Sequence, residues 1–210
     1  MTEPDVASSD ATNIGTTIRR EGDEFVINGR KWFTTGAIHP NCKVCIVMGV
    51  TGPDRDAHSR HSMVIVPTDT PGFSIVRNVP IMHHHAPEGH CEVLFRNVRV
   101  PVANLLGEEG KGFALAQARL GPGRVHHCMR TIGQCELALA LLCERALSRT
   151  AFGKHLSDFA NIQDWIAQSR VEIDQARLFV LHAAWRMDLQ GNAAARVDVS
   201  AIKLVAAQLQ

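Results

Sequence analysis

The spacing of apolar residues changes once along this chain, close to Gly112. Before this point, short runs rich in β-branched residues alternate with turn residues, a pattern typical of strands joined by hairpins. After it, apolar residues such as Val125, Cys128 and Ile132 recur at every third or fourth position, as on one buried face of a helix. The sequence therefore predicts an α+β chain, with an antiparallel β-barrel or sandwich over residues 1–111 and part of an antiparallel helical bundle over residues 112–210.

The first helix is expected to begin at the segment Leu120–Arg124, which contains two glycines and a proline. This start would place Arg124 at the N-terminal end of the helix, where backbone amides favour anions. A solvated or structural arginine is an equally good interpretation. Residues 149–154, RTAFGK, would close the same helix, and a simple C-terminal cap accounts for their basic and glycine residues.

Two further helices are expected after this segment. One covers residues 161–189, with Ile173, Ala176 and Val180 on its buried side, and Gly191 ends it. The next begins near residue 194 and places Val197, Ala201, Leu204 and Val205 in phase. Because that last pattern stops at residue 210 before it is complete, we expect the chain to be a piece of a longer protein.

The charge balance excludes some classes of partner. Lys and Arg total 22 against 21 Asp and Glu, and a net charge of +1 gives no broad field to attract nucleic acid. The longest apolar runs, residues 44–50 and 137–143, are far shorter than the ~20 residues that cross a membrane. No targeting pattern is readable at the start of the chain, so the compartment stays open.

The six cysteines lie inside apolar patterns and are interpreted as reduced and mostly buried. Cys42 and Cys45 form one CxxC pair, and a zinc site would need two more ligands, for which His39, His90 or the run at residues 83–85 are available. The simpler interpretation is preferred, in which Cys45 belongs to a strand and the histidines to an exposed loop.

Two segments have the composition of a ligand-binding surface. The loop TEPDVASSD at residues 2–10 offers small and hydroxyl residues, although an ordinary surface loop has the same composition. In the segment KWFTTG at residues 31–36, two aromatic residues precede two hydroxyl residues that could bond the edge of a flat heterocycle. The alternative is a strand whose aromatic residues face the core and the surface in turn.

Taken in order, the TEP loop, the NG-x-K-aromatic-x-T segment, VPVANLLGEEGKGF and RTAFGK resemble the acyl-CoA dehydrogenase family over essentially the whole chain. MTEPDVASSDATNI and RLGPGRVHHCMRTIG look like the subgroup of family members 10 and 11. The resemblance implies an FAD-dependent oxidoreductase of lipid metabolism and fatty acid β-oxidation. Such a flavoprotein oxidises the Cα–Cβ bond of an acyl-CoA thioester to a 2-enoyl-CoA, with hydride transfer to flavin.

The resemblance also implies site residues. Those expected to contact FAD are Thr2, Ser9, Phe33, Thr34, Thr35, Arg149 and Phe152. Ser9 and Arg124 would lie at the acyl-CoA. Arg149 and Phe152 match residues that reach the FAD of a neighbouring subunit, which implies a homodimer or homotetramer. Electron-transferring flavoprotein or oxygen would accept the electrons. The compartment would be mitochondrion or peroxisome in a eukaryote and cytoplasm in a bacterium.

The chain also departs from the family pattern. Asp5 looks like an insertion in the TEP loop, and Gly123 stands where one branch of the family carries its catalytic glutamate. The other branch carries that glutamate farther along, beyond residue 210. No catalytic residue is therefore expected in this chain, with Glu108 and Glu109 interpreted as turn residues and Glu136 as helix surface. The alternative function is a truncated, catalytically inactive flavin-binding or dimerisation module.

Overall fold

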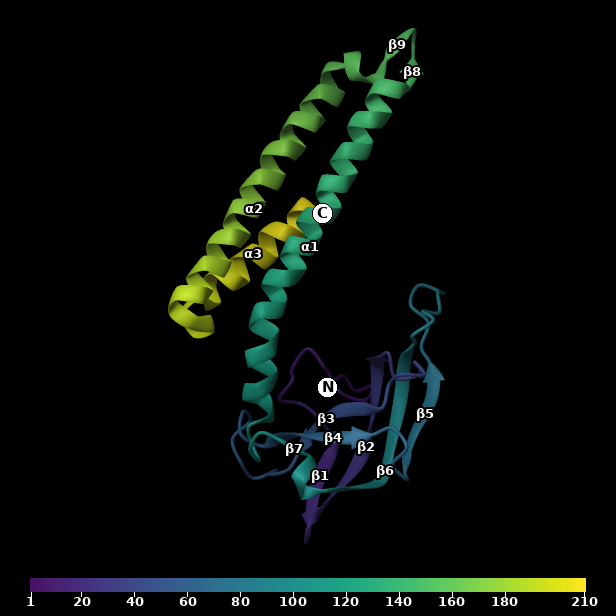
Figure 1. The fold of residues 1–210 in the computed structure, drawn as a ribbon, viewed down its shortest axis with the longest axis vertical. Coiled ribbons are helices and arrows are strands. Elements are labelled where there is room, and N and C mark those ends of the chain that lie inside the picture. Colours follow the sequence, from purple (N-terminus) through teal and green to yellow (C-terminus); the bar gives the residue numbers. More distant parts are fainter. The chain divides into compact units, whose positions relative to one another are not determined.

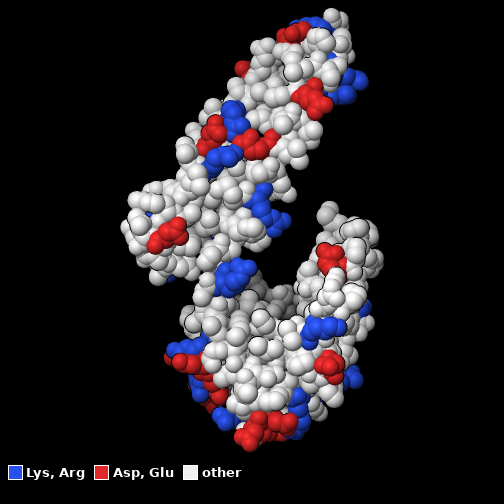
Figure 2. Space-filling model, in the orientation of Figure 1, with Lys and Arg blue, Asp and Glu red and all other residues white.

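The computed structural model describes all residues from Met1 to Gln210, and the chain forms two compact units, Met1–Ala116 and Gln117–Gln210. Figure 1 shows the first unit as a β-sheet with its loops and the second as helices. The domain boundary expected between residues 111 and 112 stays a prediction. Figure 2 shows acidic and basic side chains interspersed on the visible face of each unit, consistent with a net charge close to zero.

Seven strands form a single sheet in the first unit, in the order β5-β6-β2-β1-β3-β4-β7. Neighbouring strands are antiparallel except for β1 and β3, which are parallel and meet where Thr17 lies opposite Val50. The strands are β1 (Thr17–Glu21), β2 (Glu24–Thr35), β3 (Val44–Val50), β4 (His61–Pro67), β5 (Phe73–Asn78), β6 (His90–Pro101) and β7 (Leu105–Leu106), with a short 3₁₀ turn, η1 (Val102–Asn104), before β7.

The core of this unit lies between the two halves of the sheet. Phe25 and Ile27 on β2 are fully buried and belong to the same cluster as Val47 on β3 and Val64 on β4. Side chains from strands far apart in the sheet order can share a core only if the sheet bends over itself, as in a sandwich. The β-sandwich expectation is therefore confirmed. The barrel alternative is not realised, because β5 and β7 remain open edges of the sheet.

The helical unit consists mainly of two long helices and a third, shorter one. They are α1 (Gly112–Ser148), α2 (Ala160–Ala194) and α3 (Arg196–Leu209); between α1 and α2 lie a small hairpin, β8 (Thr150–Ala151) with β9 (Lys154–His155), and the 3₁₀ turn η2 (Leu156–Asp158). Figure 1 shows α1 and α2 side by side and antiparallel, joined by the hairpin. The buried stripe expected for the second helix is confirmed, since Ile173, Ala176 and Val180 are each at most 2% exposed.

The expected start of the first helix is wrong. The helix begins at Gly112, so Pro122 lies inside it and Arg124 is not at its N-terminal end. A proline inside a helix removes a hydrogen bond and strains the preceding turn. The helix nevertheless continues, because the residues on both sides of Pro122 are packed: Ala116 is buried before it, and Cys128 is buried after it.

The expected face of the third helix is only partly confirmed, because Val205 packs against the helical core and Ala201 is partly buried. Val197 and Leu204 are 72% and 63% exposed, whereas Val199, Ile202 and Ala206 are buried. Gly191, at φ 83° and ψ 167°, breaks the helical geometry before α3 and so resets the direction in which side chains point. Because α3 carries apolar residues on two sides, its spacing alone could not identify the packed one.

His61, at the start of β4, is fully buried, and neither of its ring nitrogens has a hydrogen-bond partner. Burial, followed by the positive charge of Arg60, lowers its pKa, while the nearby Ala57 backbone and Asp10 only partly offset this and Lys31 adds to it. The folded unit therefore disfavours a protonated imidazole.

This buried histidine predicts acid sensitivity. Its folded pKa lies below the ordinary value of about 6.5, so the unfolded chain takes up the proton first, and stability is lost as the pH falls below about 6.5. Replacing His61 by phenylalanine should flatten this loss between about pH 6.5 and 5. Urea denaturation across this range checks it, with the exposed His127→Gln as the control. An unchanged slope for His61→Phe would contradict the assignment.

Candidate functional site

The end of β2 carries a bulge. Lys31 lies opposite Val93 and Thr34 opposite Cys91, so two residues of β2, Trp32 and Phe33, stand where the partner strand has only one. Phe33 adopts a positive φ of 49°, unusual for a bulky residue, and its side chain is 42% exposed. A bulge of this kind redirects side chains. Here it leaves an aromatic ring at the surface beside two threonines.

The N-terminal loop is fastened to this strand through Glu3. Its carboxylate accepts hydrogen bonds from the Gly15 amide (2.7 Å), the Thr16 amide (3.0 Å) and the Thr16 hydroxyl (2.6 Å). Lys31 Nζ donates a further bond of 2.7 Å to Glu3 Oε1, and both side chains are about 5% exposed or less. A buried carboxylate with four donors is held in one position.

A backbone contact completes the link. The amide of Trp32 donates to the carbonyl of Thr2 at 3.0 Å, and the Glu3 amide donates to the Ser8 hydroxyl at 2.9 Å. Thr2 therefore lies beside the bulge that contains Phe33. The structure brings Thr2, Phe33, Thr34 and Thr35 together at the end of β2. Ser9 lies exposed on the same loop, next to Ser8.

The electrostatics of the pair follow from burial and bonding. Burial raises the pKa of Glu3, but the hydrogen bonds from Lys31 and Thr16 outweigh it, so the pKa of this carboxyl is lowered. Burial also lowers the pKa of Lys31, against the opposing effect of the Glu3 carboxylate. The glutamate therefore remains ionised in the folded unit, opposite a cation that has lost its hydration.

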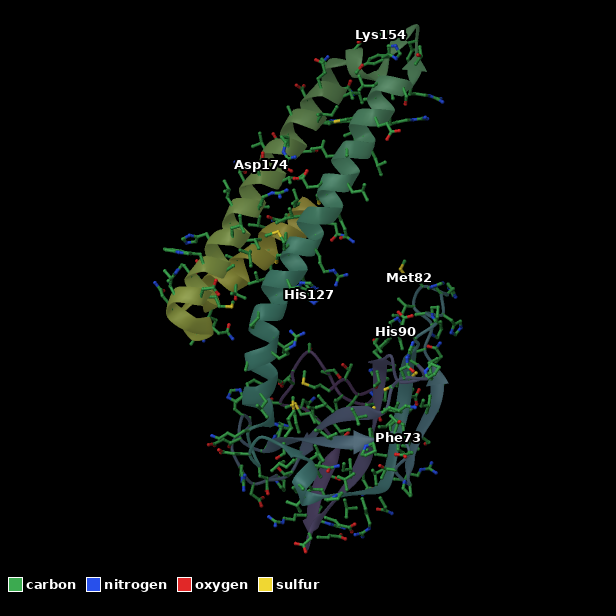
Figure 3. All side chains as sticks on the ribbon, viewed as in Figure 1. Phe73, Met82, His90, His127, Lys154 and Asp174 are labelled. Atoms are coloured by element: carbon green, nitrogen blue, oxygen red, sulfur yellow. The ribbon has the colours of Figure 1, made fainter.

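Thr35, the last residue of β2, is not isolated. Its Oγ1 shares a hydrogen bond of 2.9 Å with Nδ1 of His90, the first residue of β6, and the His90 amide donates to Asn78 Oδ1 at 2.9 Å. Figure 3 shows His90 at the base of the loop that has Met82 at its tip. His90 is thus positioned to orient the Thr35 hydroxyl, a role that the sequence did not suggest.

The zinc hypothesis gains no support from the geometry. Across residues 1–210, no three side chains of His, Cys, Asp or Glu come together in a way that could hold a metal ion. Cys91 and Cys128 are buried, the other four cysteines are partly buried, and all six are free. Burial raises the pKa of the Cys45 thiol to about 11, which disfavours the thiolate that a metal requires.

None of the helices is both long and apolar enough to cross a membrane.

The remaining predicted residues lie in the helical unit. Arg124 is partly buried within α1, and Arg149 is exposed just after this helix ends. The cap interpretation of residues 149–154 is wrong, because Phe152 and Gly153, both with positive φ, form the turn of the β8–β9 hairpin. Phe152 is 97% exposed at this turn.

Glu136 lies at the helix surface as expected, with 34% of its side chain exposed, and it also joins two helices. Arg170 Nη1 and Nη2 each donate a bond of 2.8 Å to its carboxylate, and Arg177 donates a further one. The hydrogen bonds from Arg170 hold the pKa of this carboxyl below its usual range. Glu136 on α1 therefore links α1 to α2 through hydrogen bonds from two arginines.

Sequence reasoning missed Glu3 and Lys31 as parts of this site. A signal for Lys31 was available: Phe25, Ile27, Gly29 and Lys31 alternate along one strand, and the first two are core residues. The same face of β2 therefore carries a lysine into the interior, where it needs an anion. No comparable signal identified Glu3, because it lies in a loop far away in sequence.

The two-unit fold and the residues gathered at the end of β2 place this chain in a known class of proteins. Residues 1–98 match the model of the acyl-CoA dehydrogenase middle domain, and residues 110–210 match that of the acyl-CoA dehydrogenase C-terminal domain. The chain belongs to the acyl-CoA dehydrogenase family, an oxidoreductase family.

Individual relatives agree with this assignment. "Probable acyl-CoA dehydrogenase FadE2" of Mycobacterium tuberculosis is 60% identical over 98% of this chain, and "Acyl-CoA dehydrogenase family member 10" of Mus musculus is 52% identical over 98%. A solved structure assigned to an acyl-CoA dehydrogenase of Mycobacterium abscessus covers the whole chain at 54% identity, with a TM-score of 0.93. The subgroup resemblance is therefore confirmed.

The chain spans only part of these proteins. It covers 51% of the M. tuberculosis relative, 19% of the mouse relative and 52% of the M. abscessus chain.

Proposed function

We propose that this chain supplies flavin-contacting residues of an FAD-dependent acyl-CoA dehydrogenase. Such an enzyme oxidises the Cα–Cβ bond of an acyl-CoA thioester to a 2-enoyl-CoA. The observation that carries the proposal is the end of β2, where a backbone hydrogen bond and the Glu3–Lys31 pair hold Thr2 beside the bulge at Phe33. Family membership over the whole chain supports it.

The residues gathered at the end of β2 fit a flavin. Phe33 offers an exposed aromatic ring, and Thr2, Thr34 and Thr35 offer hydroxyl groups at partly exposed or exposed positions beside it. Flat heterocycles stack on such rings, and hydroxyl groups bond their polar edges. FAD, when bound, would accept the hydride from the β-carbon. Thr35, oriented by His90, is proposed to lie near the reactive edge of the ring system.

The proposed substrate and assembly contacts involve the remaining residues. Ser9 and Arg124 would contact the acyl-CoA, and Arg149 and Phe152 would reach the FAD of a neighbouring subunit in a homodimer or homotetramer. The full exposure of Phe152 supports this last role, since a phenylalanine at a hairpin turn gains nothing from water. Electron-transferring flavoprotein or oxygen is proposed as the electron acceptor.

We propose that no carboxylate of this chain abstracts the α-proton. A catalytic base needs a pKa close to the working pH and a free lone pair. Glu3 and Glu136 each have a lowered pKa and are bonded to cationic side chains. Glu109 lies 3.8 Å from Arg55 in a loop. We therefore propose no catalytic base among residues 1–210.

The proposed role of Thr35 is tested by Thr35→Val, which removes the hydroxyl and keeps the branched shape. Loss of one hydrogen bond to the cofactor should raise the Kd for FAD roughly three- to tenfold. Titration of the purified 210-residue chain with FAD, followed by the visible absorption band, measures this. Thr17→Val on β1 is the matched control and should leave the Kd unchanged. A wild-type chain that takes up no flavin would contradict the proposed function.

A second candidate function is an inactive module for flavin binding or dimerisation. It is favoured by a row of exposed apolar residues along α2, away from its buried stripe: Leu178, Leu181, Trp185 and Leu189 are each at least 51% exposed. Exposed apolar rows of this kind mark protein contacts. Light scattering tests this candidate, because a chain that stays monomeric at high concentration would contradict a dimerisation module.

A further inference from the structure

We propose that Glu3 and Lys31 act as a positioning pair that holds the two flavin-contacting segments, the N-terminal loop and the β2 bulge, in one fixed geometry. The proposal rests on the proposed function and adds to it two residues that would not touch the ligand. Each member is close in sequence to a proposed contact: Glu3 directly follows Thr2, and Lys31 lies two residues before Phe33.

The side chains of Glu3 and Lys31 are buried and do not lie among the proposed flavin contacts. Lys31 lies opposite Val93, which is 1% exposed. The charged groups themselves are about 5% exposed or less. Neither can reach a bound molecule at the surface, so any effect on a flavin must be transmitted through Thr2 and the bulge.

The bulge also needs an anchor. Lys31 is the last residue of β2 in regular register with β6 before the bulge, and Phe33 then adopts its positive φ. A strained backbone of this kind persists only where the surroundings determine it from several sides. The Lys31–Glu3 bond fixes the residue before the bulge, and the Trp32–Thr2 bond fixes the bulge itself.

An ion pair suits this role better than an apolar contact. Burying two charges adds little net stability, because the lost hydration offsets the attraction, but such a pair tolerates only one arrangement. Here both carboxylate oxygens of Glu3 are engaged, one by the Gly15 amide and the other by Lys31 and Thr16. The pair therefore selects one position of the loop relative to the strand.

The test uses Glu3→Gln, Lys31→Met and the double variant in the 210-residue chain, with Val100→Ala as a control. Val100 is a buried core residue opposite Phe25, at the other end of the β2–β6 pairing from the bulge. FAD affinity, the shape of the visible flavin band and the thermal midpoint are measured for each. Amide hydrogen exchange without FAD is followed at Gly15, Thr16 and Trp32, whose amides donate the bonds described above.

Each single variant is expected to weaken FAD binding by at least about 30-fold and to shift the flavin band toward that of free FAD. The double variant should regain much of the thermal midpoint, since no charge is left unpaired, yet still bind FAD weakly. Exchange at the three amides should accelerate in all three variants. Val100→Ala should lower the thermal midpoint and leave both the FAD affinity and these amides unchanged.

Three results would overturn the positioning role. The first is a double variant that binds FAD as the wild type does, and the second is unchanged exchange at the three amides. The third is a Val100→Ala variant that weakens FAD binding as much as the Glu3 and Lys31 variants do, for an equal drop in the thermal midpoint. That result would reduce the pair to a purely structural role. A wild-type chain without flavin affinity counts against the proposed function instead, and the exchange measurement then decides the positioning role by itself.

Discussion

Replacing Gly29 by alanine is expected to lower the free energy of unfolding of the β unit by about 3 kcal/mol, among the largest effects of any single methyl group in this chain. A Cβ at this position would lie 2.3 Å from Thr16 Oγ1, 2.7 Å from Thr16 Cβ and 2.8 Å from Thr16 Cα. Because the last of these is backbone, the clash cannot be relieved by a rotamer change. The displaced Thr16 would also weaken its two bonds to Glu3.

The control for this substitution is Gly22→Ala. Gly22 has a φ of +62°, and no atom lies within 4 Å of the Cβ that alanine would add. Its cost is therefore only that of a left-handed backbone, roughly 1 kcal/mol. Urea denaturation of the two variants separates steric overlap from backbone strain. Equal losses for the two would show that the close approach of Thr16 to Gly29 is not present in solution.

Replacing Ile132 by alanine is expected to destabilise the helical unit by about 3 kcal/mol. Ile132 on α1 is 1% exposed and belongs to a cluster with Ile173 on α2 and Ile202 on α3. The substitution removes atoms from the place where all three helices meet and leaves a cavity that long, packed helices cannot easily close.

The matched control is Leu137→Ala on the same helix. Leu137 is 62% exposed, so its truncation should change the free energy of unfolding by less than about 0.5 kcal/mol. Both variants are compared with the wild type by thermal unfolding followed through helical circular dichroism. A large loss for Leu137→Ala would show that this face of α1 is covered in solution, as expected if copies of the chain associate through it.

Local patterns predicted most of the architecture. The change of period near Gly112 marks the passage from strands to helices, and the buried stripe of α2 at Ile173, Ala176 and Val180 is the one that its spacing indicated. Both succeed for the same reason: the direction of a side chain in a strand or helix repeats with a fixed period, so a packed face is visible in sequence. The loop and strand that carry Thr2 and Phe33 were likewise indicated by their own residues together with a family resemblance.

The features that failed or were missed depend on contacts between distant residues. The start of α1 and the packed face of α3 were set by burial against other elements and by the break at Gly191, which local spacing does not report. Lys31 is placed on the inner face by its own strand, but its partner Glu3 lies in a loop 28 residues away. The sequence by itself determined which segments become strands and helices; only the tertiary structure decided which buried charge meets which, because an ion pair forms wherever the fold brings its members together.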